Sequence, residues 1–314
     1  MSLAVDPASR NALPRGYDMS KLTKAALALG ASATCMLLGA SEPHAATIKI
    51  GVAANFQYTL SDIIAAYNLY YGDSISYDFD STGNLKAAIL AGGTTTNPYD
   101  LFLSADTAAP AAVSTLGMVY SGTTQAPFFY ATGSIVFASK TTSVSGGVPS
   151  GFTGHLLIAT PSKAPYGLAA MTVLDEAPWS LGLTTTSTYP VSNVYTSANI
   201  STTYSALNDP TTPSYAYGFV AKSYVCTNGS PSTSTKLKYF YEYKYDGSSS
   251  PNFGHTGTTS QTYPQIVQNG IALQRSAQTT ATKAAVINFI NFLLTNTTYG
   301  VGLRQQYCYG TTAP

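Results

Sequence analysis

The chain has 314 residues, of which 45% are hydrophobic and only 9% are charged, and its formal net charge at pH 7 is +1. Soluble domains usually carry about 25% charged residues, and this chain has neither a basic block nor an acidic tail, which argues against nucleic-acid binding. The length suits two lobes of ordinary domain size.

The N-terminal segment has the features of an export signal. Lys21 and Lys24 precede an apolar stretch at 25–40, and small residues follow at 41–46. This order is typical of a secretory signal peptide, and the stretch is short for a membrane span. An uncleaved signal anchor is the alternative. We therefore expect residues 1–46 to be a leader and signal peptide, and the protein to be periplasmic or extracellular.

The rest of the chain alternates between strand and helix patterns. Apolar and alternating runs predict strands at 47–53, 75–79, 100–104, 130–138, 155–159, 193–196, 217–221, 237–245 and 266–273. Helical periodicity predicts helices at 60–71, 85–91, 107–116, 166–174, 282–294 and 299–306. Strands and helices that alternate at this spacing predict α/β lobes with mostly parallel sheets.

The composition shifts to Ser, Gly, Thr and Tyr at 227–262, which predicts a solvent-exposed excursion in which 237–245 forms a strand or hairpin arm. Two cysteines, Cys226 and Cys308, remain outside the leader. An even pair in an exported chain predicts a disulfide, and the pair lacks the spacing and His neighbours of a metal site.

Three segments share one shape: an apolar strand, a short turn of small polar residues, and the start of a helix. They are 53–55, 80–83 and 164–167. Ligands of open α/β sheets bind beyond the carboxyl ends of the strands, where helix N-termini favour an anion. These turns contain no Arg or Lys. Singly they would be ordinary helix caps, but together they favour a neutral cage of hydrogen-bond donors around an anion.

A set of short runs follows in a fixed order along the chain. They are VAANF at 52–56, STGNL at 81–85, YDLFLSAD at 99–106, YATG at 130–133, APYGLA at 164–169, GFVA at 218–221 and FINFL at 289–293. Together, over about residues 47–310, these runs resemble the periplasmic molybdate-binding component of bacterial ABC importers. DLFLSAD and APYGLA are the most specific of them.

The resemblance implies an α/β, two-lobed periplasmic-binding-protein fold of type II. Two mostly parallel sheets flanked by helices would be joined by crossover strands, with hinge closure around the ligand. Lobe one would comprise 47–129 and 268–314, and lobe two would comprise 130–267.

The resemblance also implies a set of ligand-binding residues. Ala54 would supply a backbone N–H and Asn55 its side-chain amide. Ser81 would donate its hydroxyl and N–H, and Tyr166 and Ser201 would each give a backbone N–H.

Two residues depart from the family pattern. Ala54 stands where a small hydroxyl residue is usual, and Asp80 stands where Gly or Ser is usual, directly before Ser81. A carboxylate there would repel a fully ionised oxyanion, or it would accept a hydrogen bond from a protonated one such as hydrogen phosphate or hydrogen arsenate. Alternatively, Asp80 points away or caps the next helix.

By resemblance the protein captures molybdate or tungstate and passes it to the membrane permease of an ABC importer. It would be a monomer without a cofactor, and molybdenum or tungsten would be present only in the bound oxyanion. The alternatives are a binding protein for a protonated oxyanion such as phosphate or arsenate, and an exported structural or adhesive protein built on the same fold. An enzyme is not expected, because the sequence has no nucleophile elbow, zinc-protease motif, P-loop or dinucleotide fingerprint.

Overall fold

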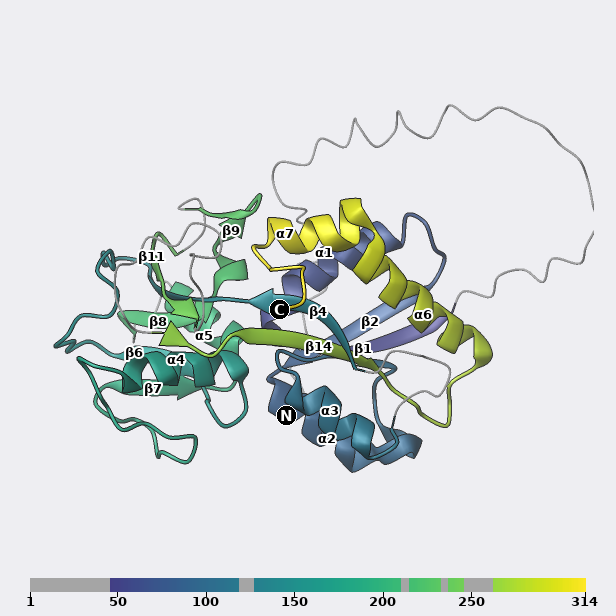
Figure 1. Cartoon of the computed structure of the whole chain (residues 1–314), viewed down its shortest axis with the longest axis horizontal. Coiled ribbons are helices and arrows are strands. Elements are labelled where there is room, and N and C mark those ends of the chain that lie inside the picture. Colours follow the sequence, from purple (N-terminus) through teal and green to yellow (C-terminus); the bar gives the residue numbers. More distant parts are fainter. Residues whose placement is uncertain (1–45, 119–126, 210–214, 233–236, 246–261) are drawn as a thin grey trace, which may run out of the picture. The chain divides into compact units, whose positions relative to one another are not determined.

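A computed structural model describes residues 46–118, 127–209, 215–232, 237–245 and 262–314 (Figure 1). Residues 1–45 of the predicted leader and signal peptide lie outside these residues. Within the part of the chain that is described, no helix combines the length and apolar character needed to cross a membrane.

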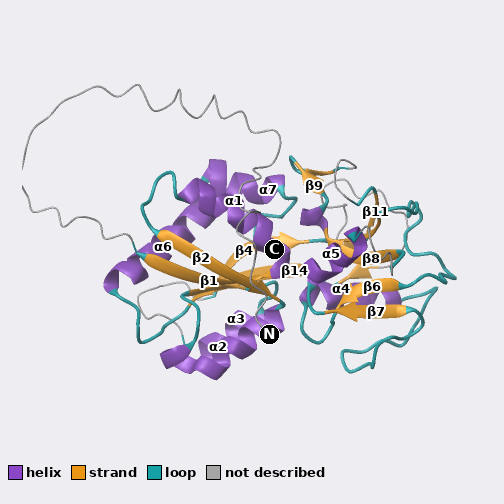
Figure 2. Cartoon of the chain, turned by 180° about the vertical axis from the view of Figure 1, so that it is seen from behind, coloured by secondary structure: helices purple, strands orange, loops and turns teal. Residues whose placement is uncertain are grey.

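The first sheet has helices on both of its faces. Its strands run in the order β2 (Ser74–Asp80), β1 (Thr47–Ala53), β3 (Leu101–Leu103), β14 (Ile266–Ala272) and β4 (Phe128–Gly133). β1 is parallel to β2 and β3, whereas β14 is antiparallel to β3 and β4. The helices of one face are α1 (Gln57–Tyr67), α6 (Thr280–Thr295) and α7 (Gly302–Gln306), and those of the other are α2 (Thr82–Thr96) and α3 (Ala108–Thr115) (Figure 2).

The second sheet is built in the same way. Its strands run in the order β11 (Tyr239–Glu242), β5 (Ile135–Ser139), β8 (Tyr217–Ala221), β6 (Leu156–Ala159) and β7 (Val194–Ser197). β6 is parallel to β7 and β8, and β5 is antiparallel to β8 and β11. Helices α4 (Pro165–Asp175) and α5 (Ile200–Asn208) pack against this sheet.

Short elements complete the described chain. They are the 3-10 helices η3 (Ala54–Phe56) and η4 (Lys222–Tyr224), the π-helical turn η5 (Thr297–Val301), and the short strands β9 (Cys226–Thr227), β10 (Ser230–Pro231), β12 (Lys244–Tyr245) and β13 (Thr262–Tyr263).

The prediction of two α/β sheets flanked by helices is confirmed, but parallel and antiparallel pairings are evenly balanced in each sheet. The antiparallel pairings arise because two segments of the chain cross between the sheets. One predicted strand, 130–138, is in fact two: β4 belongs to the first sheet and β5 to the second, with Ser134 between them. The return crossing precedes β14, and the strand before it, β13, pairs with β12 in a separate two-stranded sheet. The chain therefore leaves the first sheet at Ser134 and re-enters it at Ile266.

Glycine is required at position 133, where the segment that joins β4 to β5 passes Tyr166 of α4. A Cβ placed on Gly133, the last residue of β4, would overlap the hydroxyl of Tyr166 and approach the amide of Gln268 within 2.5 Å. The crossover strand can lie against Tyr166 only because this position has no side chain.

Two predictions about individual elements need correction. α5 was not predicted, because its sequence ISTTYSALN is rich in residues of modest helix propensity. Segment 237–245, expected as a strand or hairpin arm of an exposed excursion, instead supplies β11, which extends the second sheet by pairing with β5. Part of the excursion lies outside the described residues.

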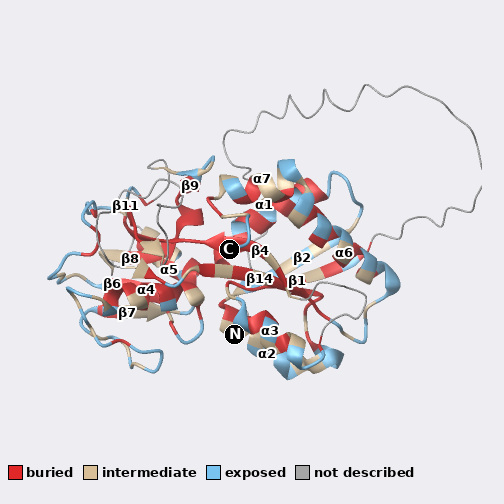
Figure 3. Cartoon of the chain, viewed as in Figure 1, coloured by how far each residue is buried: buried red, intermediate tan, exposed pale blue. Residues whose placement is uncertain are grey.

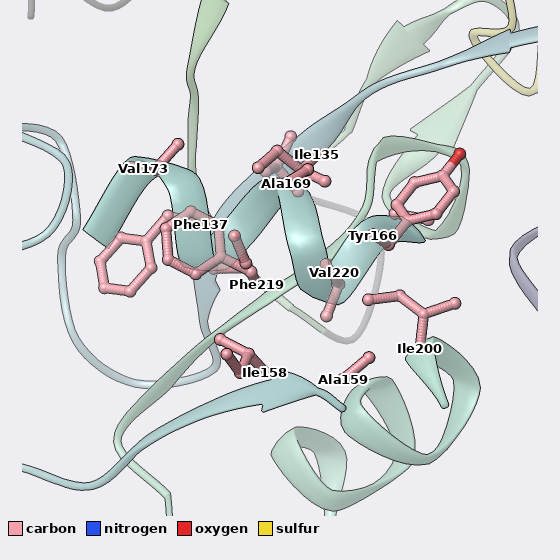
Figure 4. Packing of buried hydrophobic residues seen from close by; sticks show 14 of the residues in the cluster. Ile135, Phe137, Ile158, Ala159, Tyr166, Ala169, Val173, Ile200, Phe219 and Val220 are labelled. Carbon is pink, nitrogen blue, oxygen red and sulfur yellow. The ribbon is translucent and has the colours of Figure 1, made fainter. Parts of the chain in front are cut away.

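Each sheet has its own apolar core, and β1 and β14 are buried almost throughout (Figure 3). In the second core, Phe137, Phe219 and Val220 pack under α4, and Tyr166 stands at one end of the cluster with its hydroxyl directed away from it (Figure 4). Each Å² of apolar surface that is buried contributes about 25 cal/mol to folding, so these cores stabilise both sheets without a ligand.

The predicted disulfide is confirmed. Cys226 and Cys308 are bonded, with their Cα atoms 6.0 Å apart. Cys226 lies just after η4, which follows the second sheet, and Cys308 lies just after α7, which packs on the first. The bond therefore links the two halves of the described chain covalently.

Candidate functional site

Turns from both sheets converge on one small cavity. Its lining comes from the ends of β1 and β2 and from the segments that follow β1, β2, β3, β6 and β7: Ala53, Ala54, Asn55, Asp80, Ser81, Thr82, Ala105, Ala164, Pro165, Tyr166, Asn199 and Ile200. The cavity volume is about 10 Å³, which is room for about one water molecule. Carboxyl ends of strands and helix N-termini are the expected location of a ligand in α/β sheets.

Direct hydrogen bonds between the two halves surround the cavity. The backbone N–H of Gly83 donates to the carbonyl of Lys163 at 2.8 Å. The side chain of Asn199 donates to Asp80 at 3.2 Å. Gln57 donates to the hydroxyl oxygen of Ser201 at 2.6 Å, so the structure shows the cavity closed.

A buried network of amides and phenols, here called the inner wall, includes the lining residues Asn55 and Tyr166 and extends behind them. The Asn55 amide lies 2.9 Å from Gln268 Oε1, 3.1 Å from the Tyr309 hydroxyl and 3.2 Å from the Tyr166 hydroxyl. Gln268 also donates to the Tyr166 hydroxyl at 3.1 Å. Burial raises the pKa of Tyr166 and of Tyr309 far above the ordinary tyrosine value. Both phenols therefore remain neutral, and the wall adds no negative charge.

The backbone of the first turn is fixed both from the other half of the chain and from the C-terminal segment. The Tyr224 hydroxyl donates to the Ala54 carbonyl at 2.6 Å, and Ser223 donates to the Asn55 carbonyl at 3.1 Å. Tyr309 donates to the same Asn55 carbonyl at 2.6 Å. With their carbonyls held from behind, Ala54 and Asn55 are kept rigidly at the cavity.

The helices that face the cavity differ in their N-caps. Ser81 caps α2 by accepting a bond from the Asn84 N–H at 3.3 Å, and Asn199 caps α5 by accepting one from Thr202 at 3.0 Å. Among the described residues, no side chain caps α4, whose first position is Pro165. Proline has no N–H, so the first N–H donor of α4 belongs to Tyr166. Helix N-termini leave such donors unsatisfied within the helix.

Among the described lining residues, Asp80 is the only charged one. Its Oδ1 accepts a bond from the Ser81 N–H at 2.6 Å, and its Oδ2 accepts one from the Asn84 side chain at 3.0 Å. Asp80 thus partly caps α2, and it also lines the cavity. The Ser81 N–H that the sequence comparison assigned to a ligand is bonded to Asp80 in this structure.

The structure places most of the predicted site residues around the cavity. Ala54, Asn55, Ser81 and Tyr166 line it, as does Asp80. Ser201 is buried just behind the described lining and bonds to Gln57. The Asn55 amide points into the buried network, and the Tyr166 ring does more than pack, since its hydroxyl accepts two bonds.

Asn199 is the main residue that the sequence did not single out. Its side chain caps α5 and reaches Asp80 across the cavity. An Asn directly before an Ile-Ser-Thr-Thr run is an N-cap signature, and this signal would have identified both α5 and the residue that faces the cavity.

Comparison with known proteins extends over most of the described chain. The family model described as bacterial extracellular solute-binding protein matches residues 48–298. Two relatives named molybdate-binding protein ModA are similar: the one from Rhodobacter capsulatus is 32% identical over 154 residues, and the one from Azotobacter vinelandii is 33% identical over 167 residues. The matched segments span 48% and 52% of this chain and only 58% and 60% of those proteins.

Solved structures give the same fold over a longer stretch. The periplasmic molybdate-binding protein of Azotobacter vinelandii superposes with a TM-score of 0.65 and 22% identity, covering 85% of this chain and 99% of that one. The substrate binding domain of a putative molybdenum ABC transporter from Clostridium difficile superposes with a TM-score of 0.52 and 15% identity, covering 86% and 100%.

Proposed function

The chain belongs to the bacterial extracellular solute-binding protein family, and on this premise we propose that it captures a tetrahedral oxyanion, with molybdate or tungstate as the first candidates. The anion would be held between the two sheets and passed to the membrane permease of an ABC importer. The protein would act in transport, outside the cytoplasm, and would perform no chemical step on its ligand.

One observation carries the proposal: helix N-termini from both sheets meet at a single closed cavity. Such termini bind anions through their N–H groups and dipoles, without a cationic side chain. The described lining contains small, largely neutral residues and an uncapped helix, α4. The closed cavity of about 10 Å³ holds about one water molecule, so it must widen to take a tetrahedral oxyanion, and it is far below the roughly 300 Å³ or more of pockets for larger organic ligands.

The relatives support molybdate in particular. Both sequence relatives carry molybdate in their names. The matched segment covers little more than half of each relative, so the choice of anion depends on the cavity as well.

A protonated oxyanion such as phosphate or arsenate is the second candidate, and Asp80 favours it. A carboxylate that lines the cavity repels a dianion, but it can accept a hydrogen bond from an anion that still carries a proton. The two candidates therefore differ in how binding should respond to pH.

A thermal-shift and calorimetric comparison of molybdate, tungstate, sulfate, phosphate and arsenate at several pH values tests the proposal. A ligand present at 100 times its Kd stabilises the folded state by about 2.7 kcal/mol, which is readily detected. We expect molybdate and tungstate to raise the Tm. A response to phosphate and arsenate alone would favour the second candidate. No response to any of the five anions would contradict oxyanion binding and favour a structural or adhesive role.

A further inference from the structure

The carboxylate of Asp80 lies between helix N-termini that belong to different sheets. Asp80 ends β2, and its Oδ1 accepts bonds from the backbone N–H of Ser81 at 2.6 Å and from the side chain of Asn199 at 3.2 Å. Oδ2 accepts a bond from Asn84 at 3.0 Å. Ser81 is the N-cap of α2, and Asn199 is the N-cap of α5.

The Asp80 carboxylate occupies the position that we expect for an anionic ligand. A negative charge is most favourable at a helix N-terminus, where N–H groups and the helix dipole act together. Asp80 supplies that charge from within the chain and takes up the Ser81 N–H, which a bound oxyanion would otherwise receive. Hydrogen bonds to a carboxylate are among the stronger ones in proteins, so a ligand has to compete with them.

The same carboxylate also connects the two halves of the structure. Its bond from Asn199 crosses the cavity, close to the Gly83–Lys163 backbone bond that crosses beside it. Asp80 is only partly buried, whereas Ser81 and Asn199 are buried. Its side chain therefore has access to solvent and can rotate away from the two buried donors.

Building on the proposed function, we propose that Asp80 is a built-in anion: its carboxylate occupies two donors beside the cavity, the Ser81 N–H and the Asn199 side-chain amide, and a divalent oxyanion must displace it to bind. Asp80 is then a determinant of affinity that opposes binding. A like charge left beside a dianion would be strongly unfavourable in a partly buried cavity, so binding and departure of the carboxylate are coupled.

Calorimetry with molybdate on Asp80→Asn and Asp80→Ala tests this proposal. Both changes remove the competing charge, so we expect the Kd to fall by about tenfold or more, a gain of about 1.4 kcal/mol. Asp78→Asn is the matched control. It removes one negative charge from the same strand, but Asp78 pairs with Lys49 at 2.8 Å and is not among the described lining residues. Its Kd should stay within about twofold of the parent, as for most surface substitutions.

Equal or weaker molybdate binding by both Asp80 variants, with the fold intact, would overturn the proposal. Weaker binding of phosphate by these variants would show instead that Asp80 accepts the proton of a protonated oxyanion, which also overturns it.

A second measurement needs no ligand and separates this proposal from the proposed function. The amide proton of Ser81 should resonate downfield in the ligand-free parent, because it is bonded to a carboxylate, and should move upfield in Asp80→Ala. If no anion binds to any variant, the proposed function fails, and this resonance still decides whether Asp80 holds the donor. An unchanged Ser81 resonance would overturn the built-in anion.

Discussion

The turn that starts α2 and the turn that starts α4 face the same cavity from different sheets, yet they are completed in opposite ways. At α2, Ser81 caps the helix and Asp80 adds a carboxylate that binds the Ser81 N–H and Asn84. At α4, the described residues provide no capping side chain, and Ala164 and Pro165 carry neither charge nor side-chain donor.

The difference shows that strand–turn–helix geometry alone does not make a binding site. The α2 turn satisfies much of its own donor capacity with side chains of the same turn, whereas no described side chain caps the α4 turn. A ligand between them would gain from α4 directly and would have to replace bonds at α2. Substitutions in these turns and away from them should therefore separate effects on stability, on closure and on binding.

The largest expected effect lies outside both turns, at the disulfide. Replacing Cys226 and Cys308 together by Ala removes a crosslink that spans 82 residues. The free energy of unfolding should fall by about 3–5 kcal/mol, because the unfolded chain gains loop entropy. Urea denaturation of the oxidised parent and the variant measures this loss. A reducing agent should lower the parent to the level of the variant and leave the variant unchanged, and a loss below about 1 kcal/mol would contradict the prediction.

Ser81→Ala should weaken molybdate binding. The Ser81 hydroxyl accepts the Asn84 N–H as a helix cap and keeps its own proton to donate. Losing a donor to a charged acceptor costs about 1.5–3 kcal/mol, roughly ten- to a hundredfold in Kd. Thr279→Ala is the matched control, because it removes a hydroxyl cap from α6, away from the cavity. The control should lose about 1 kcal/mol of stability with no change in Kd, and equal Kd values for both variants would contradict a role for Ser81 in binding.

Gly83→Ala should weaken the contact between the two halves of the structure without lowering the stability of the fold. Gly83 has helical backbone geometry, so alanine favours α2 by roughly 0.5–1 kcal/mol. The added Cβ, however, would lie 3.0 Å from the Lys163 Cα and 3.1 Å from its carbonyl oxygen. We expect an unchanged or higher Tm, together with molybdate binding weakened by about 1 kcal/mol or more as the halves close less tightly. Gly72→Ala, whose Cβ would meet open space, should leave binding unchanged.

The smallest expected effect on binding concerns the inner wall. Tyr166→Phe removes an acceptor shared by Asn55 and Gln268, which should cost about 1–3 kcal/mol of stability because buried amide donors lose a partner. Binding should change less, because the proposed ligand contact is the backbone N–H. Tyr243→Phe, which removes the acceptor of the Val148 N–H at 2.8 Å in the second sheet, should lose similar stability. A larger affinity loss in Tyr166→Phe than in Ser81→Ala would contradict the proposal that Tyr166 contacts the ligand through its backbone N–H.

Much of this fold could be predicted from local pattern. Strands β1, β2, β6 and β8 and helices α4 and α6 appear within a few residues of their expected positions, because buried strands and amphipathic helices impose strong apolar periodicity. The failures occur where tertiary structure decides. Nothing local distinguishes β4 from β5, since one extended run crosses from one sheet to the other and Ser134 interrupts only its pairing.

The candidate site was predictable as a set of turns but not as a network. Resemblance identified the segments that line the cavity. Contacts between residues far apart in sequence, such as Asn55 with Gln268 or Asp80 with Asn199, carry no local signal. Whether Asp80 would face the cavity or cap α2 could not be decided from alternation along a strand, and the structure shows that one carboxylate does both.

Diffraction from crystals grown with tungstate, recorded at the tungsten absorption edge, would locate the bound anion. We expect a single anomalous peak in the cavity lined by Ala54, Ser81 and Tyr166, with the anion oxygens at hydrogen-bond distance from the α4 N-terminus. No peak at tungstate concentrations that stabilise the protein, or a peak elsewhere on the chain, would contradict oxyanion binding in this cavity.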